Sequence, residues 1–122
     1  MKSALVTGGT RGIGLAICRA LIERGYAVTA TYLHCEKDAE EAQKRLPAAR
    51  FIKADVADEQ SVKEAIVQLP QIDLLVNNAG ISLYKQVQDI TAREWDEVFS
   101  VNAKGAFLCC KYAVKKMIAR QS

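Results

Sequence analysis

Residues 4–14 read Ala-Leu-Val-Thr-Gly-Gly-Thr-Arg-Gly-Ile-Gly, and this stretch decides the fold. A short apolar run, residues 4–7, stops abruptly at glycines, and a helical pattern begins within those same glycines. The residues at helical spacing on one face are Ile13, Ala16, Ile17, Ala20 and Leu21. Gly25 then ends the helix. An apolar strand that passes through a glycine turn directly into a helix is typical of an α/β fold.

The same alternation continues along the rest of the chain. The later strands are expected at residues 27–33, 51–53 and 72–76, and the later helices at 36–46, 58–69 and from 91 onward. Short apolar strands separated by helices imply a parallel sheet covered on both faces. Right-handed crossovers then give the strand order 3-2-1-4. We therefore predict a single domain over residues 1–122, an α/β Rossmann-like doubly wound parallel sheet of four strands and four helices.

The start of the last helix has a strong signal. Thr91 and Glu94 have the spacing of a capping box, in which each side chain bonds to the backbone of the other residue. Ile90 and Trp95 occupy the positions of a hydrophobic staple. The sequence therefore predicts a helix that begins directly after Thr91.

The glycine run suits a phosphate-binding turn. Side chains there would keep the backbone away from a bound pyrophosphate, and glycine adopts the required backbone angles easily. The N–H groups and the dipole of the new helix then face the negative charge. Because the glycines lie directly between the first strand and the first helix, this interpretation is favoured over a turn that serves packing alone.

Two more groups of residues directly follow strands, namely Asp55-Val56 and residues 77–80, Asn-Asn-Ala-Gly. The carboxyl ends of parallel strands lie along one edge of the sheet, so we expect both groups beside the glycine turn. Asp55 can accept a hydrogen bond from an exocyclic amine such as that of adenine. The alternative is a carboxylate that forms a turn or caps a helix. For Asn77 and Asn78 the alternative is a purely structural role in a turn.

Together these segments resemble the short-chain dehydrogenase/reductase family. Residues 7–14 match its T-G-x-x-x-G-x-G fingerprint, residues 77–80 its N-N-A-G signature, and residues 101–105 the segment with its catalytic asparagine. The resemblance is closest to 3-oxoacyl-[acyl-carrier-protein] reductases, and it implies that Asn102 serves a proton relay. The residues that it implies for dinucleotide binding are Thr7, Gly8, Thr10, Arg11, Gly12, Ile13, Gly14, Asp55, Val56, Asn77, Asn78, Ala79 and Gly80.

The cofactor is predicted to be NADP(H) in preference to NAD(H). In folds of this kind a carboxylate at the end of the second strand binds the ribose 2′-hydroxyl of NAD. Here residues 31–33 are Thr, Tyr and Leu, with no acid. Arg11 stands where NADP-dependent relatives carry a basic residue, and a guanidinium suits a phosphate dianion. The alternative for Arg11 is a solvated loop charge.

The family reduces a carbonyl or oxidises a hydroxyl with a serine and a Tyr-x-x-x-Lys motif, which the resemblance places after a fifth strand. Residues 1–122 are therefore expected to be the cofactor-binding half, truncated before these residues and inactive alone. Tyr112 and Lys116 have the motif's spacing, but Tyr112 lies about three helical turns beyond Asn102 and is predicted to be a packing residue. The expected substrate is a small-molecule or carrier-bound carbonyl compound. An aminopentanone group on elongation factor P is the alternative.

Assembly and a rival function also follow from the resemblance. In relatives the last helix builds a subunit interface, so we expect a homo-oligomer of the full-length protein. The unpaired edge of strand 72–76 and the last helix should make the 122-residue chain prone to self-association. The rival function is a non-catalytic module that senses a nicotinamide dinucleotide or, when it binds one, interacts with a partner. Asn102 argues against it, because a sensor has no need of the relay asparagine.

Composition excludes several classes of protein. The net charge is +3 with no run of basic residues, so nucleic-acid binding is not expected. No apolar run reaches the roughly 18–20 residues of a membrane span. Residues 1–3, which precede the first strand, are too few for a signal peptide, so none is expected. The four cysteines lack metal-site spacing and are expected to stay reduced. These features predict a cytoplasmic protein without a metal site.

Overall fold

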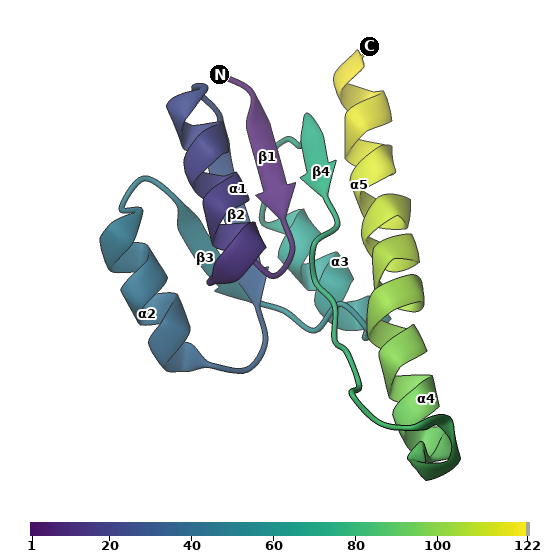
Figure 1. Ribbon diagram of the computed structural model, residues 1–122. Coiled ribbons are helices and arrows are strands. Elements are labelled where there is room, and N and C mark those ends of the chain that lie inside the picture. Colours follow the sequence, from purple (N-terminus) through teal and green to yellow (C-terminus); the bar gives the residue numbers. More distant parts are fainter. Residues whose placement is uncertain (122) are drawn as a thin grey trace.

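The computed structural model describes residues 1–121, in which strands and helices alternate as predicted (Figure 1). The strands are β1 (Ser3–Val6), β2 (Ala27–Tyr32), β3 (Arg50–Lys53) and β4 (Leu74–Val76). The helices are α1 (Gly12–Glu23), α2 (Glu36–Arg45), α3 (Glu59–Val67), α4 (Ala92–Phe99) and α5 (Gly105–Gln121), with a 3-10 turn η1 (Val87–Asp89) and a π turn η2 (Ser100–Lys104). All strand pairs are parallel and the order is β3-β2-β1-β4, which confirms the predicted Rossmann-like sheet.

Alternating side chains of the strands give the sheet two hydrophobic cores. Leu5 points into one core, with Ile72 and with residues of α3 and α5. Ala4 and Val6 point into the other core, with Cys18 of α1. Helices α1 and α2 lie on one side of the sheet, and α3 and α5 lie on the other (Figure 1). Both faces are therefore covered, as the apolar strands required.

The buried face of α1 differs from the predicted one. Ile17 and Leu21 of the predicted face do pack against the core. The buried residues of this helix are however Gly14 and Cys18, whereas Ile13 is 75% exposed and Ala16 is exposed. The helix starts so close to the preceding loop that a Cβ at position 14 would stand 2.0 Å from the carbonyl oxygen of Gly8. This close approach, which apolar periodicity does not report, orients α1.

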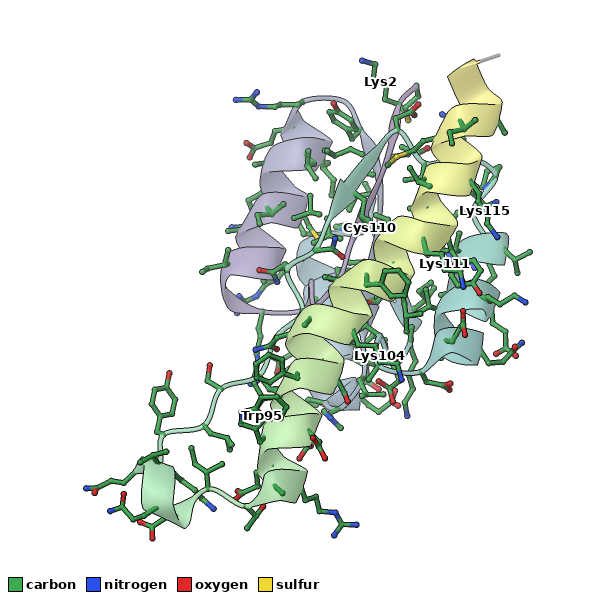
Figure 2. The ribbon with its side chains drawn as sticks, turned by 90° about the vertical axis from the view of Figure 1, so that its right-hand side faces the viewer. Lys2, Trp95, Lys104, Cys110, Lys111 and Lys115 are labelled. Atoms are coloured by element: carbon green, nitrogen blue, oxygen red, sulfur yellow. The ribbon has the colours of Figure 1, made fainter. Side chains whose placement is uncertain are left out.

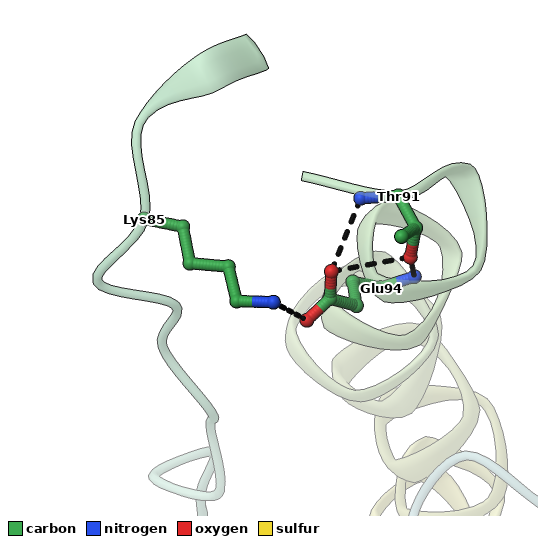
Figure 3. A network of polar contacts seen from close by, with 3 residues as sticks. All are labelled: Lys85, Thr91 and Glu94. Atoms are coloured by element: carbon green, nitrogen blue, oxygen red, sulfur yellow. Dashed lines mark hydrogen bonds and ion pairs between the residues drawn. The ribbon is translucent and has the colours of Figure 1, made fainter. Parts of the chain in front are cut away.

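The last helix begins as predicted and changes its winding once. Thr91 Oγ1 accepts a hydrogen bond from the Glu94 N–H at 3.1 Å, and the Glu94 carboxylate accepts one from the Thr91 N–H at 3.1 Å, which confirms the capping box (Figure 3). Lys85 Nζ lies 2.7 Å from Glu94 and, together with Thr91, lowers the pKa of that carboxyl group. The π turn η2 then joins α4 to α5 without a break, so the predicted last helix is one continuous run whose winding changes at η2 (Figure 1).

Candidate functional site

The carboxyl ends of the four strands lie at one edge of the sheet, beside a cleft of about 400 Å³. The cleft is lined by the loops that follow all four strands, as expected where the strand order reverses. The residues predicted to bind the cofactor that line it are Gly8, Thr10, Arg11, Gly12, Ile13, Gly14, Asp55, Val56, Asn78, Ala79 and Gly80. Thr7 and Asn77, also predicted, are not part of the lining.

The loop after β1 presents backbone donors at the start of α1. Gly8 and Gly12 have φ angles of +69° and +57°, which residues with side chains rarely adopt. Apart from the neighbouring residues and the backbone of its own helix, no atom of the described chain lies within 4 Å of the place where a Gly12 Cβ would stand, so the loop is open there. Helix α1 has no side-chain cap and no acidic residue in its first turn. Its first N–H groups are therefore available to an anion.

Thr7 joins the loop after β1 to the loop after β4. Its side chain is buried, and its Oγ1 accepts hydrogen bonds from the N–H groups of Asn78 (3.1 Å) and Ala79 (3.0 Å). In return, Asn78 Nδ2 donates to the carbonyl oxygen of Gly8 at 2.9 Å. Thr7 and Asn78 thus hold two walls of the cleft against each other.

Asp55 combines a structural role with a place in the cleft. Its Oδ1 accepts a hydrogen bond from the Ala57 N–H at 3.0 Å, and its own N–H donates to Ser61 Oγ at 2.9 Å. Asp58 occupies the N-cap position of α3, but its side chain makes no capping hydrogen bond. The turn-forming role that was the alternative for Asp55 is therefore present, and the same residue lines the cleft.

Two further predicted residues, Asn77 and Asn102, bond from outside the cleft to α5 and to the loop after β4. Asn77 is exposed, and its Nδ2 donates to Cys110 Sγ of α5 at 3.3 Å. Asn102, in the π turn, accepts from the Ile81 N–H at 2.8 Å and donates to the Ile81 carbonyl at 2.9 Å. Asn102 does not line the cleft itself. It fixes the loop after β4, whose residues Gly80 and Ile81 line the cleft.

The end of β2, the loop after it and the first turn of α2 form another part of the cleft wall, whose residues were not among the predicted cofactor-binding residues. The lining residues there are Thr31, Tyr32, Leu33, His34, Cys35 and Asp38, and Ala54, Ile81 and Val101 line other parts of the cleft. Asp38 Oδ2 lies 3.8 Å from Arg11 Nη1. Residues 31–33 contain no acid, as the cofactor prediction required, whereas the structure brings Asp38 of α2 into the wall. The sequence signal that could have indicated Asp38 is its place in the first turn of α2, after the N-cap residue Cys35 and close to the end of β2.

Tyr112 and Lys116, the second match to a Tyr-x-x-x-Lys spacing, lie outside the cleft. The Tyr112 hydroxyl donates to Glu59 Oε2 of α3 at 2.6 Å, and Lys116 Nζ donates to the Leu69 carbonyl. Lys111 and Lys115 lie along the same stretch of α5 (Figure 2). The Glu59 carboxylate raises the pKa of Tyr112, which is opposite to what a general acid near neutral pH requires. Tyr112 packs α5 against α3, as predicted.

The buried thiols are not reactive groups. Burial raises the pKa of Cys18 and of Cys109 to about 11, and thiolates are the reactive form of cysteine. Cys18 lies beneath the glycine loop, where its Sγ is 4.0 Å from the Gly9 carbonyl oxygen. It therefore contributes packing and not chemistry.

The chain is similar in sequence to proteins of one known family. Residues 2–122 match the family model described as short chain dehydrogenase. The chain is 39% identical to the 3-oxoacyl-[acyl-carrier-protein] reductase FabG of Staphylococcus aureus, over 99% of this chain and 52% of that protein. It is 38% identical to versicolorin reductase 1 of Aspergillus parasiticus, over 95% of this chain and 47% of that protein. The chain thus spans about half the length of the curated relatives that it matches.

Solved structures show the same arrangement. The short-chain dehydrogenase/reductase of Serratia marcescens has a TM-score of 0.88 and 32% identity, over 95% of this chain and 51% of that chain. A blue fluorescent protein from a metagenomic library, solved in complex with NADPH, has a TM-score of 0.86 and 36% identity, over 95% of this chain and 51% of that chain. Both similarities confirm the predicted fold.

Proposed function

We propose that this chain, which belongs to the short-chain dehydrogenase family, is the cofactor-binding part of an NADP(H)-dependent oxidoreductase. The proposed reaction is reduction of a carbonyl group, of the 3-oxoacyl type named for the Staphylococcus aureus relative, or oxidation of a hydroxyl group. The substrate would be a small molecule or a group bound to a carrier. The named reductases among the relatives and the NADPH complex of a structural neighbour support the proposal.

The uncapped and acid-free start of α1 is the observation that carries the proposal. α4 satisfies its first N–H groups with the side chains of Thr91 and Glu94. α2 and α3 lack a side-chain cap but carry acidic residues in their first turn, whereas α1 has neither at its edge of the cleft. A pyrophosphate would provide the missing acceptors. The glycines fit such a group, since Gly12 leaves open space and Gly14 lies against the Gly8 carbonyl.

Each wall of the cleft would then hold one part of the dinucleotide, which supplies the hydride chemistry when bound. The backbone of residues 8–14 would hold the pyrophosphate, Asp55 the adenine amine, and Arg11 the 2′-phosphate. The lining within the described residues contains no serine and no lysine. Tyr32, which does line it, donates its hydroxyl to Glu36 at 3.1 Å. We therefore propose that the 122-residue chain binds the dinucleotide without reducing a substrate.

The contacts of Asn102 are compatible with a non-catalytic sensor as well as with an enzyme. Both polar groups of the Asn102 side chain are bonded to the backbone of Ile81. A sensor would need this bracing as much as an enzyme would, so Asn102 alone does not separate the two functions. The similarity to named reductases favours the enzyme. The relay role of Asn102 remains part of the proposal.

Replacing Arg11 by alanine tests the cofactor assignment. We expect Arg11→Ala to weaken NADPH binding by about 1.5–2 kcal/mol, through loss of a charge-assisted contact with the 2′-phosphate. Binding of NADH should change by less than about twofold, because NADH lacks that phosphate. Calorimetric titration of both dinucleotides into the 122-residue chain measures this. Arg19→Ala removes an exposed charge of α1 outside the cleft and is the matched control. Equal losses for NADPH and NADH would reject the proposed role of Arg11.

Helices α4 and α5 carry an exposed apolar stripe that suits self-association. Its residues are Trp95, Phe99, Phe107, Val114 and Ile118. The rings of Trp95 and Phe99 stack with centroids 4.1 Å apart, and Trp95 lies at the α4 end of the stripe (Figure 2). No helix within residues 1–121 is both long enough and apolar enough to span a membrane. We propose that a second copy of the chain covers this stripe.

Phe107 lies within this stripe and is 61% exposed. We expect the chain to self-associate at micromolar concentration, and Phe107→Glu to shift it toward the monomer, because the charge would be buried at the contact. Sedimentation velocity measures both states. Tyr84→Glu alters an exposed side chain outside the stripe and should leave association unchanged. A wild-type chain that stays monomeric would contradict the proposal.

A further inference from the structure

The rim of the cleft between α1 and α2 holds two opposite charges. Arg11 Nη1 and Asp38 Oδ2 are 3.8 Å apart, and both residues line the cleft. Arg11 is the N-cap residue of α1 and Asp38 lies in the first turn of α2, so the pair joins two separate elements. The Arg11 side chain is 83% exposed and that of Asp38 30%. A ligand in the cleft can therefore reach the guanidinium while the carboxylate stays in the wall.

The other acids near this rim are already engaged. Glu36 contacts Lys53 Nζ at 3.1 Å and accepts the Tyr32 hydroxyl, so its pKa is lowered by those two partners. Glu36 does not line the cleft. Asp55 lines the cleft but is bonded within its own turn. Among the described residues, Asp38 is thus the acid that competes for Arg11.

We propose that Asp38 is a selectivity residue, which lowers the affinity of the cleft for NADP(H) by holding the Arg11 guanidinium that the 2′-phosphate needs. This inference rests on the proposed dinucleotide site. A phosphate dianion must displace Asp38 from Arg11 or share the guanidinium with a second anion, and either arrangement weakens its binding. NAD(H) carries only a hydroxyl at that position and requires no exchange. Asp38 thus reduces the preference for NADP(H) over NAD(H) that Arg11 creates.

Removing the Asp38 charge should therefore raise the affinity for NADPH and leave that for NADH nearly unchanged. We expect Asp38→Asn to raise NADPH affinity by about threefold to fivefold, the upper part of the range of an exposed ion pair, and to leave NADH affinity within twofold. Glu41→Gln removes an exposed charge of α2 outside the cleft, and should change neither affinity by more than about twofold. Asp38 also lies in the first turn of α2, where its negative charge stabilises the positive end of the helix. Asp38→Ser, a second uncharged variant that also removes this charge, should reproduce the gain in NADPH affinity. Thermal melting verifies that each variant is folded.

The Arg11→Ala background separates competition from direct repulsion. If Asp38 acts by occupying Arg11, Asp38→Asn should raise NADPH affinity by less than about twofold once Arg11 is absent. A full gain in that background, or a loss of NADPH affinity in Asp38→Asn alone, would overturn the inference. Equal changes for NADPH and NADH, or none, would overturn it while leaving the proposed function intact. A wild-type chain that binds neither dinucleotide would reject the proposed function and this inference together.

Discussion

Gly14→Ala is expected to abolish dinucleotide binding and to lower the free energy of unfolding by about 3 kcal/mol or more. The added Cβ would stand 2.0 Å from the Gly8 carbonyl oxygen and 2.6 Å from Asn78 Nδ2. Both neighbours are fixed, because Asn78 Nδ2 is bonded to that same carbonyl. The start of α1 must therefore move away from the loop, which separates the donors that would hold a pyrophosphate. Urea unfolding and NADPH titration measure the two effects.

A neighbouring glycine gives the control for this experiment. Gly12 has a φ of +57° and, apart from the neighbouring residues and the backbone of its own helix, no atom of the described chain within 4 Å of the place of its Cβ. Gly12→Ala should therefore lower the free energy of unfolding by only about 1 kcal/mol, the cost of a left-handed backbone at a residue with a side chain. If both substitutions destabilise the chain equally, the contact between Gly14 and Gly8 is not what shapes this loop.

Strand order was predictable because topology depends on few local signals. Four apolar runs, each ended by polar or glycine residues, leave only parallel pairing with right-handed crossovers. The residues that follow those runs then gather at one edge of the sheet. For this reason Gly8, Asp55 and Asn78, which are far apart in the sequence, could be assigned to one cleft before the structure was known.

Features that depend on contact geometry were not predictable in this way. The apolar residues of α1 suggested a buried Ile13, whereas the helix is rotated to bring Gly14 and Cys18 inward. The hydrogen on Gly14 is the only group that fits against Gly8, and a pattern of apolar residues does not register such a contact. The contact between Asp38 and Arg11 was not predictable for the same reason, because it depends on the position of α2 relative to the sheet.

The support of the cleft can be tested without touching its interior. Thr7 is 2% exposed and does not line the cleft. Its hydroxyl accepts the N–H groups of Asn78 and Ala79, and the Asn78 side chain holds the Gly8 carbonyl. Asn78 N–H has a second acceptor in the Val76 carbonyl at 3.1 Å. Loss of the hydroxyl would therefore leave the Ala79 N–H without its acceptor and loosen two loops at once.

Thr7→Val is accordingly expected to lower the free energy of unfolding by about 1–3 kcal/mol, since valine keeps the shape of threonine while the part-buried Ala79 N–H loses its partner. NADPH affinity should fall by roughly tenfold or more, because the walls at Gly8 and Ala79 lose their common anchor. Thr7→Ser, which removes a methyl group and keeps the hydroxyl, should retain NADPH affinity within about threefold. Urea unfolding and NADPH titration of both variants separate the effect of the hydroxyl from that of packing. If serine weakens NADPH binding as much as valine does, Thr7 acts through its methyl group and the hydrogen-bonded anchor is not what holds the cleft together.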